Sequence, residues 1–506
     1  MKVLLLNPPR YYWPFINEGD NYLLPQALPC LGAVLRENDV KVRLVDCLPL
    51  KMGWKSLGRL LERERPDVLG VCTSESMFSH EAVRACELMK GIDQDTATVV
   101  GGHHFSALPG ETLENGSIDY IVIGEGEYTL LELVKALEKG GSLKKVRGIA
   151  FREGGKAIVT EPRPLIRDLD ELPVPAYDLM PMDKYVDSRL LWSQGGTTMH
   201  HSRGCIDNCD FCACWVHMSQ RSMKEGKLRC TQMWRTKGVE RTLDEAELLN
   251  RVYGKKFIVF GDDTWNVDPK WSAAFCEGIK ERGLDFKWYA FLRADLMVRD
   301  EKLGVLKKMV DSGMSHVCIG VERATDSELR LLNKSYSSDM VRDSFRILKE
   351  KYPQVFRQGT FIFGFRNETK ESMRRMFEYA KELDLDYPGF HPITPVPGTK
   401  TWEEAKEKGW LEVDDYRKYD WVTPIMSSRK MSRKEIDSEM VRLYWDYLTF
   451  PKVLKGVFSR HSQRRNMHLW CLNVAARVWL SGLKDRTMLR GSGSTLGMVK
   501  PKWYDG

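Results

Sequence analysis

Three cysteines lie close together in the chain, and their type and spacing suit metal chemistry. Cys205, Cys209 and Cys212 are separated by three residues and then by two. Three thiolates at these spacings on one short loop can bind three of the iron atoms of a cubic iron–sulfur cluster. Because three thiolates leave one iron without a protein ligand, that iron has an open coordination site at which chemistry can take place.

Two other uses of these thiols are a structural zinc site and a disulfide. A structural zinc ion needs a fourth protein ligand, and Cys214, the nearest candidate, is poorly placed because only one residue separates it from Cys212. A disulfide is disfavoured in the cytoplasm. We expect a cytoplasmic location because the apolar run Val3–Leu6 is too short for a signal peptide and no stretch is long enough to span a membrane. Zinc and a purely structural cluster remain the alternatives.

The composition is that of a folded protein of several domains. With 506 residues, 42% of them hydrophobic and 29% charged, the chain can build more than one sizeable core, which excludes wholesale disorder. The net charge of +7 is unevenly spread, because the stretch from Pro451 to the end has eleven basic and only two acidic residues. A basic tail that also carries Trp470 and Trp479 predicts either a solvated helical face or contact with an anionic membrane surface.

Residues 1–140 are predicted to form a doubly wound parallel α/β sheet that supplies one half of the site. Short apolar runs alternate there with amphipathic segments, a pattern typical of βαβ units. Ligands of such sheets lie beyond the carboxyl ends of the strands. The polar or glycine-rich turns at those ends are Asn7-Pro8-Pro9, Thr73-Ser74-Glu75, Gly101-Gly102-His103-His104 and Gly124-Glu125-Gly126-Glu127. Each turn taken singly is more simply an ordinary βα turn.

The rest of the chain is predicted to form a linker, a second α/β domain and a helical end. Residues 141–190 contain a hairpin signal and a run of prolines, which indicates a linker. Six strand–helix units follow between 191 and 415, and this number favours an open, partial (β/α)6 barrel over a closed eight-stranded one. Residues 416–506 are aromatic-rich and predicted to be helical.

The cysteine loop resembles that of the radical S-adenosylmethionine (SAM) superfamily. The pattern Cys-x3-Cys-x-aromatic-Cys, with Phe211 as the aromatic residue and Ser202-Arg203-Gly204 before it, stands at the start of a partial barrel. The resemblance implies a [4Fe-4S] cluster on Cys205, Cys209 and Cys212, with SAM bound at the open iron. It also implies cleavage of SAM to a 5′-deoxyadenosyl radical, which takes hydrogen from unactivated carbon.

Further positions follow the order expected from this resemblance. They imply that a group of residues after successive strands contacts SAM, although each acid taken singly is as readily an N-cap or a surface charge. Arg323 and Ala324 replace the usual small pair after Glu322, and the proline of the Gly-x-Pro-Glu-Thr motif is absent after Gly364, which puts that turn's geometry in question. The implied contacts are Phe211, Asp262, Asp263, Arg293, Glu322 and Gly364.

The first domain is similar to the cobalamin-binding domain found in one large branch of that superfamily. The Asp-x-His-x-x-Gly motif that supplies a cobalt ligand elsewhere is absent, because Cys47 and Leu48 follow Asp46. A dinucleotide is disfavoured because Asn7-Pro8-Pro9 cannot form the glycine-rich turn that it requires. His103 and His104 are interpreted as contacts to the cofactor rather than as cobalt ligands. The implied cobalamin contacts are Asn7, Pro8, Ser74, Glu75, Gly101, Gly102, His103, His104, Gly124, Glu125, Gly126 and Glu127.

Together these resemblances imply an oxygen-sensitive C-methyltransferase that uses SAM, a [4Fe-4S] cluster and methylcobalamin to act on a small molecule. A flavodoxin or ferredoxin would supply electrons, and no nucleic-acid partner is expected. The alternative is a cyclase or ring-rearranging enzyme of tetrapyrrole, lipid or natural-product biosynthesis. Two further hypotheses are a sensory module that binds the cofactors without turnover and a zinc-dependent nucleic-acid protein.

Overall fold

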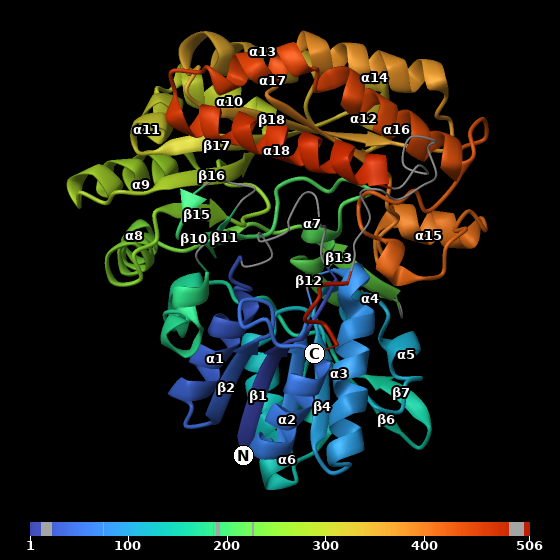
Figure 1. Ribbon diagram of the computed structural model, residues 1–506. Helices are drawn as coiled ribbons and strands as arrows, with labels where there is room; N and C mark the ends of the chain where they lie inside the picture. The colour runs from blue at the N-terminus through green and yellow to red at the C-terminus, as the bar shows by residue number, and fades with distance from the viewer. Residues whose placement is uncertain are drawn as a thin grey trace.

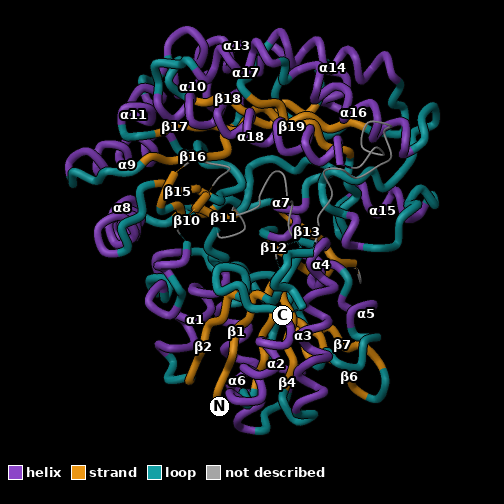
Figure 2. Tube along the Cα trace, in the orientation of Figure 1, coloured by secondary structure: helices purple, strands orange, loops and turns teal. Residues whose placement is uncertain are grey.

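The computed structural model describes residues 1–11, 23–73, 75–185, 187–188, 193–224, 227–484 and 500–505. Ser74, one of the predicted cofactor contacts, lies outside these ranges. Two α/β sheets form the two halves of the molecule, and a layer of short elements lies between them (Figure 1). The tube trace shows the same division, with the strands of each half surrounded by helices (Figure 2).

The N-terminal half is built on a seven-stranded sheet of order β2-β1-β3-β4-β5-β6-β7, parallel from β2 to β5. This confirms the predicted doubly wound sheet, whose strand order places the ligand crevice at the carboxyl ends of the strands. The parallel strands are β1 (Lys2–Asn7), β2 (Lys41–Asp46), β3 (Val68–Cys72), β4 (Ala97–Gly101) and β5 (Tyr120–Val122). The helices are α1 (Ala27–Glu37), α2 (Trp54–Glu64), α3 (Ser79–Ile92), α4 (His103–Ala107), α5 (Pro109–Thr112) and α6 (Glu127–Lys139).

The sequence of β1 explains why this sheet is covered on both faces. Val3, Leu4 and Leu6 are completely buried, and Leu5 is 2% exposed. A continuous apolar run, rather than an alternating one, is typical of a parallel strand with helices on both sides.

The predicted hairpin extends the first sheet past residue 140 rather than forming part of a free linker. β6 (Ile149–Glu153) pairs antiparallel with β5, and β7 (Lys156–Val159) pairs antiparallel with β6. Beyond the hairpin, Tyr177 and Tyr185 are each 1% exposed and pack into one apolar cluster with residues of both halves. Four 3₁₀ turns flank the hairpin. One precedes it, η2 (Leu143–Lys145), and three follow it, η3 (Leu169–Glu171), η4 (Tyr177–Leu179) and η5 (Met182–Lys184).

The second half is a six-stranded parallel sheet in chain order, which confirms the open partial barrel. Its strands are β10 (Gly196–Met199), β15 (Phe257–Phe260), β16 (Lys287–Leu292), β17 (Met314–Glu322), β18 (Phe356–Phe363) and β19 (Tyr387–Pro392). Its helices are α8 (Val239–Glu247) with a π-turn over Leu248–Val252, α9 (Pro269–Glu281), α10 (Ala294–Lys302), α11 (Val305–Asp311), α12 (Asp326–Leu331), α13 (Ser338–Lys351), α14 (Lys370–Glu382) and α15 (Lys400–Glu407).

Three short strand pairs and α7 were not predicted, because elements of two to five residues are too short to leave a periodic pattern. They lie at or beside the junction of the two halves (Figure 1). The pairs are β8 (Asp187–Ser188) with β9 (Ser193–Gln194), β11 (Ser202–Arg203) with β14 (Arg235–Thr236), and β12 (Gln220–Lys224) with β13 (Lys227–Thr231). Helix α7 covers Ala213–His217.

The C-terminal region is helical, as predicted. It comprises the 3₁₀ turn η7 (Tyr416–Lys418), α16 (Arg433–Tyr447), α17 (Phe450–Val457) and α18 (Ser462–Lys484). Residues 500–505 return to the N-terminal half, where the buried Tyr504 packs against Trp54 and Tyr11. Within the described ranges, none of the helices is long and apolar enough to cross a membrane.

Candidate active site

The three cysteines lie on one loop between β11 and α7. The Sγ of Cys205 is 3.1 Å from the Oγ1 of Thr264 and accepts a hydrogen bond from the backbone N–H of Asp207 at 3.4 Å. Cys209 accepts a hydrogen bond at its carbonyl from the N–H of Cys212, at 3.1 Å. Thr264 follows the second barrel strand, so two successive units of the barrel shape this loop.

The buried thiols of this loop depend on a bound metal for ionisation. Burial raises the pKa of Cys205 and raises that of Cys209 to about 12, so both thiols need a metal to become thiolates near neutral pH. Across the described part of the chain, no three Cys, His, Asp or Glu side chains are grouped closely enough to hold one metal ion. Three cysteine thiols on one loop are ligands of the kind that hold an iron–sulfur cluster.

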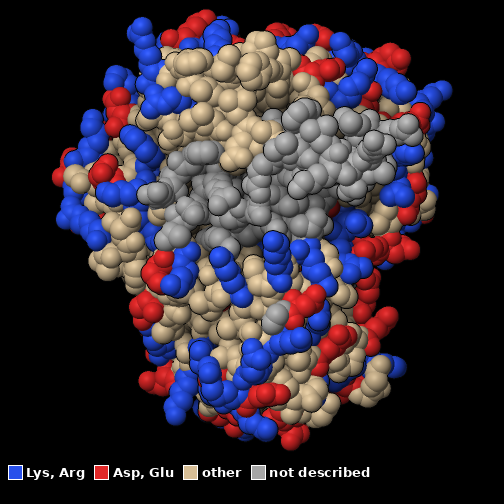
Figure 3. All heavy atoms as spheres, in the orientation of Figure 1, with Lys and Arg blue, Asp and Glu red and all other residues tan. Residues whose placement is uncertain are grey.

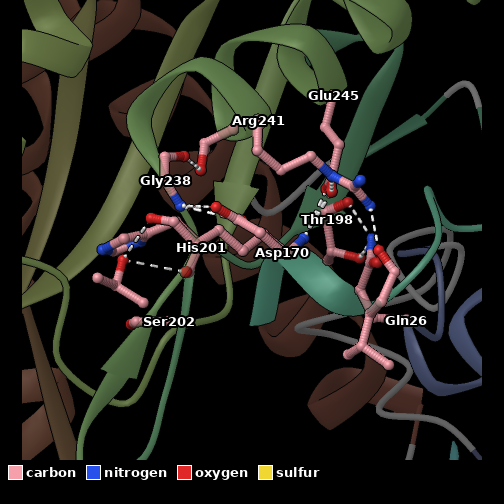
Figure 4. A network of polar contacts seen from close by, with 12 residues as sticks. Gln26, Asp170, Thr198, His201, Ser202, Gly238, Arg241 and Glu245 are labelled. Atoms are coloured by element: carbon pink, nitrogen blue, oxygen red, sulfur yellow. Dashed lines mark hydrogen bonds and ion pairs between the residues drawn. The ribbon is translucent and has the colours of Figure 1, made fainter. Parts of the chain in front are cut away.

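Asp262 and Asp263 both follow β15, but the structure gives them different surroundings. The Oδ1 of Asp262 accepts hydrogen bonds from the N–H of His201 at 3.0 Å and from the hydroxyl of Ser202 at 2.6 Å. Figure 4 shows His201 and Ser202 within a network of polar contacts that also includes Gly238 and Asp170. Asp263 is only partly buried, and burial raises its pKa to about 6. Asp262 therefore anchors the strand that leads into the cluster loop, and Asp263 presents the more available carboxylate.

Arg293 is tied to the cluster loop by an ion pair, and Glu322 is linked to the loop through Lys334. A guanidinium nitrogen of Arg293 lies 2.5 Å from the carboxylate of Asp207, within the cysteine loop. Glu322 adopts a left-handed backbone with φ of 61° and pairs with Lys334 at 3.2 Å. The Lys334 ammonium is also 5.9 Å from the ring centre of Phe211. Lys334 thus joins two predicted site residues, and no sequence pattern had singled it out.

The turn at Gly364 forms although the proline of the Gly-x-Pro-Glu-Thr motif is absent. Gly364 has φ of 82°, and its N–H donates to the Glu368 carboxylate at 3.1 Å. Arg323, where the related motif has a small residue, pairs with the same carboxylate at 2.7 Å. A buried ion pair therefore closes the turn whose geometry the missing proline had put in question.

At the carboxyl edge of the first sheet, some of the predicted residues are fixed by contacts within the domain, and others keep polar groups that a ligand could reach. Asn7 donates to the Asp46 carboxylate at 2.8 Å, and the next residue, Pro8, is buried. Gly102 has φ of 109°, and a Cβ there would lie 1.7 Å from the carbonyl oxygen of Thr73, so this turn beside Gly101 requires glycine. Glu75 is partly buried, and burial raises its pKa to about 7.

His103 and His104 are buried at this edge in different ways. The Nδ1 of His104 lies 3.1 Å from the hydroxyl oxygen of Ser76. Neither ring nitrogen of His103 makes a hydrogen bond of good geometry to any described residue, and burial lowers the pKa of His103 to about 4. The ring of His103 faces that of His217, with centroids 5.8 Å apart. His217 belongs to α7, so the edge of the first sheet meets the helix that follows Cys212.

The glycine-rich turn after β5 makes a contact that sequence reasoning did not foresee. Gly124 has φ of 80°, and its N–H donates to the hydroxyl of Ser106, while Gly126 lies against Leu31 and Val122. The carboxylates of Glu125 and Glu127 form ion pairs with Arg203, which lies two residues before Cys205. These two acids, predicted as cofactor contacts, are therefore engaged by the cluster loop itself.

Comparisons with known proteins identify both halves. Residues 13–134 match the B12 binding domain and residues 199–380 match the radical SAM superfamily. An uncharacterized methyltransferase of Pyrococcus horikoshii is 34% identical over 91% of this chain and 95% of its own length. The anaerobic magnesium-protoporphyrin IX monomethyl ester cyclase of Rubrivivax gelatinosus is 28% identical over 94% of this chain and 82% of its own length.

The fold also matches a solved structure. The radical S-adenosylmethionine methyltransferase TsrM from Kitasatospora setae, with cobalamin and a [4Fe-4S] cluster bound, superposes with a TM-score of 0.67 at 17% identity. The match covers 94% of this chain and all of that one. The class is therefore a radical SAM enzyme with a B12-binding domain. More narrowly, the chain belongs to the cobalamin-dependent radical SAM methyltransferase family, whose cofactors are a [4Fe-4S] cluster, SAM and cobalamin.

The residues at the junction fit a large polar cofactor. Among the described residues, several buried polar atoms have no hydrogen-bond partner there, and such groups normally find one. Cobalamin carries many amide groups and a phosphate, which would accept from or donate to them. These atoms are both ring nitrogens of His103, Nδ1 of His217, Oγ1 of Thr73 and Nε of Arg221.

Proposed function

We propose that the protein methylates an unactivated carbon of a small-molecule substrate bound between its two halves. The observation that carries this proposal is the meeting of α4 and α7, where the His103 and His217 rings are 5.8 Å apart. It brings the carboxyl edge of the cobalamin-binding sheet next to the helix that begins directly after Cys212. Both cofactor sites can therefore act on one substrate without a large movement of either domain.

The residues of the chain have separate tasks in this proposal. Cys205, Cys209 and Cys212 would hold the cluster, while Asp263 and Phe211 would contact SAM. Gly101, Gly102 and His103 would contact cobalamin. When bound, the cluster and SAM supply a radical that abstracts hydrogen from carbon, and cobalamin supplies the methyl group.

The surroundings of Asp46 show that this motif offers no histidine to cobalt. Where other cobalamin proteins place a histidine after this aspartate, Cys47 and Leu48 follow it here. Asn7 and Tyr185 each donate to the Asp46 carboxylate at 2.8 Å, so the carboxylate is used within the domain.

Products separate methylation from the alternative, cyclisation or ring rearrangement. The protein would be reconstituted anaerobically with iron, sulfide and cobalamin, then incubated with reductant, SAM carrying a deuterated methyl group, and a metabolite extract from cells lacking the gene. Methylation yields one S-adenosylhomocysteine per turnover and a metabolite heavier by the labelled methyl. Formation of 5′-deoxyadenosine with no S-adenosylhomocysteine would instead favour the cyclase reaction, consistent with the 28% identity to the magnesium-protoporphyrin cyclase.

Two partners and a location follow from the same proposal. A flavodoxin or ferredoxin in the cytoplasm would reduce the cluster, and all twelve cysteines are free, as a reducing compartment requires.

The C-terminal helices would contact an anionic membrane that holds an apolar substrate. Figure 3 shows uncharged atoms over α17 and α18 with basic side chains at the margin. Phe450 and Phe458 are 66% and 77% exposed there.

Membrane contact can be tested by co-sedimentation with vesicles of phosphatidylserine and phosphatidylcholine. Replacing Phe450 and Phe458 by Glu should lower the bound fraction several-fold, because exposed aromatic rings and nearby cations contribute together at such surfaces. Neutral phosphatidylcholine vesicles serve as the control. Equal sedimentation of the wild type and the double variant would exclude this role for the helices.

A further inference from the structure

The arginine that precedes the cluster loop is held by carboxylates from the other domain. Arg203 lies in β11, directly before Gly204 and Cys205. Its two terminal nitrogens are 2.8 Å from a Glu125 oxygen and 2.5 Å from a Glu127 oxygen. Both acids follow β5 at the carboxyl edge of the cobalamin-binding sheet, 76 or more positions earlier in the chain.

A second arginine completes this group. Arg235 lies directly opposite Arg203 in the antiparallel pair β11–β14. One guanidinium nitrogen of Arg235 is 2.9 Å and 3.0 Å from the two oxygens of Glu125, and it also donates to the Ile166 carbonyl at 2.6 Å. Two cations from the barrel are thus balanced by two anions from the first domain. The four side chains are between 4% and 17% exposed.

Electrostatics makes this arrangement dependent on contact between the domains. Like charges directly opposite each other destabilise a strand pair, and an unpaired buried ion costs several kcal/mol. Among the described residues, the carboxylates that pair with Arg203 and Arg235 are those of Glu125 and Glu127. The positive charges of Arg203 and Arg235, on the strand pair that leads into the cluster loop, are therefore neutralised only when the first domain packs against this pair.

We infer that Arg203, Arg235, Glu125 and Glu127 form an interdomain lock that fixes the position of the cluster loop relative to the cobalamin-binding edge. These are positioning residues, because they act through the loop that carries Cys205. The inference rests on binding of the cluster and of cobalamin, and only its product readout depends on the proposed methylation. The lock sets how far the substrate radical lies from the methyl donor.

The test uses the reconstituted holoenzyme and four variants. Arg203→Gln leaves two carboxylates facing one arginine, whereas Glu127→Gln leaves Arg203 paired with Glu125. The double variant keeps the Arg235–Glu125 pair and restores charge balance. Arg36→Gln is the control, because it breaks an exposed ion pair, 2.6 Å long, between the first domain and Asp178 of the segment that follows it.

Three measurements read out the lock. Iron per chain reports occupancy of the cluster site, and pulsed EPR between the reduced cluster and cobalt(II) reports their separation. The ratio of S-adenosylhomocysteine to 5′-deoxyadenosine reports how often a radical ends in methyl transfer. We expect this ratio to fall about tenfold or more in Arg203→Gln, because misplacement by an ångström costs rate on that order. The EPR distance distribution should broaden in the same variant.

The other variants distinguish a role in positioning the cluster loop from a role in folding alone. Glu127→Gln should show the same changes to a smaller degree with full iron content, so it decides the matter if Arg203→Gln fails to fold. The double variant should recover iron content relative to Arg203→Gln, and Arg36→Gln should match the wild type throughout. An unchanged product ratio and distance in Glu127→Gln would overturn the lock. Absence of S-adenosylhomocysteine in the wild type would instead overturn methylation and leave the distance test valid.

Discussion

Single residues around the cluster loop are constrained by backbone geometry as well as by chemistry. Gly204 has φ of 86°, and a Cβ there would lie 1.9 Å from the carbonyl oxygen of Met233. A side chain at this position would therefore push β11 away from the chain that crosses it. Gly254 offers a comparison, because its φ is 65° but no atom lies within 4 Å of its Cβ position.

We expect Gly204→Ala to lose most of its iron and to unfold at a lower temperature than Gly254→Ala. The control variant bears only the left-handed backbone penalty, about 1–2 kcal/mol. Gly204→Ala bears the same penalty and a clash with backbone that cannot move freely. Iron content and thermal unfolding of the two purified variants check this, and equal values in both would show that the crossing chain can shift.

At the scale of elements, one carboxylate joins the barrel to the C-terminal helix. Asp386 precedes β19, accepts from the backbone N–H of Arg357 in β18 at 3.0 Å, and pairs with Arg464 of α18 at 2.6 Å. His468 of α18 lies 3.3 Å from the same carboxylate. Burial alone would raise the pKa of Asp386, but His468, Arg357 and Arg464 together hold it below its usual value.

The lowered pKa of Asp386 determines how the stability of the fold should depend on pH. Because the folded-state pKa is depressed, Asp386 stabilises the fold above the ordinary aspartate pKa, and this contribution is lost as pH falls through the lower folded value. Asp386→Asn should cost about 3–5 kcal/mol at pH 7 by leaving buried cations unpaired. It should also weaken the pH dependence between about pH 4 and 2.

The matched control for that change is Asp384→Asn, because Asp384 pairs with Lys349 at 3.1 Å on an exposed surface. Such a pair contributes less than about 1 kcal/mol. Urea unfolding of both variants between pH 2 and 7 measures the two effects. A loss in Asp386→Asn no larger than that in the control would contradict an anchoring role.

At the scale of the whole molecule, residues 500–505 pack against the N-terminal domain although they are far from it in sequence. The Tyr504 side chain is 2% exposed, and its carbonyl accepts from the Trp54 N–H at 2.9 Å. Arg84 of α3 lies over the ring of Tyr504. Figure 1 shows the C-terminus beside the N-terminal domain, although the helices before it cover the barrel.

Replacing Tyr504 by Ala should therefore loosen the N-terminal half rather than the C-terminal helices. Loss of a buried aromatic side chain typically costs about 3–5 kcal/mol. Hydrogen exchange should accelerate in α2 and α3, while Lys502→Ala, at an exposed position, should leave it unchanged. Acceleration confined to α16–α18 would show that the segment does not stabilise the first domain.

Local patterns were sufficient to predict the strands of the two main sheets and the class of chemistry, but not the short strand pairs or α7 at the junction. The apolar run in β1 and the spacing of Cys205, Cys209 and Cys212 depend on neighbouring residues alone, so they can be recognised without a structure. The same holds for Gly102 and Gly364, whose turns require the conformations that glycine adopts. These features predicted both sheets and the cluster loop.

Only the tertiary structure shows which of the predicted polar residues are engaged by other parts of the protein. Glu125 and Glu127 were predicted to contact cofactor, yet they bind Arg203, which is distant in sequence. Asp262 anchors the loop while its neighbour Asp263 remains available. A carboxylate looks the same in sequence whether it faces a ligand or an arginine, because its partner is chosen by chain segments that only folding brings together.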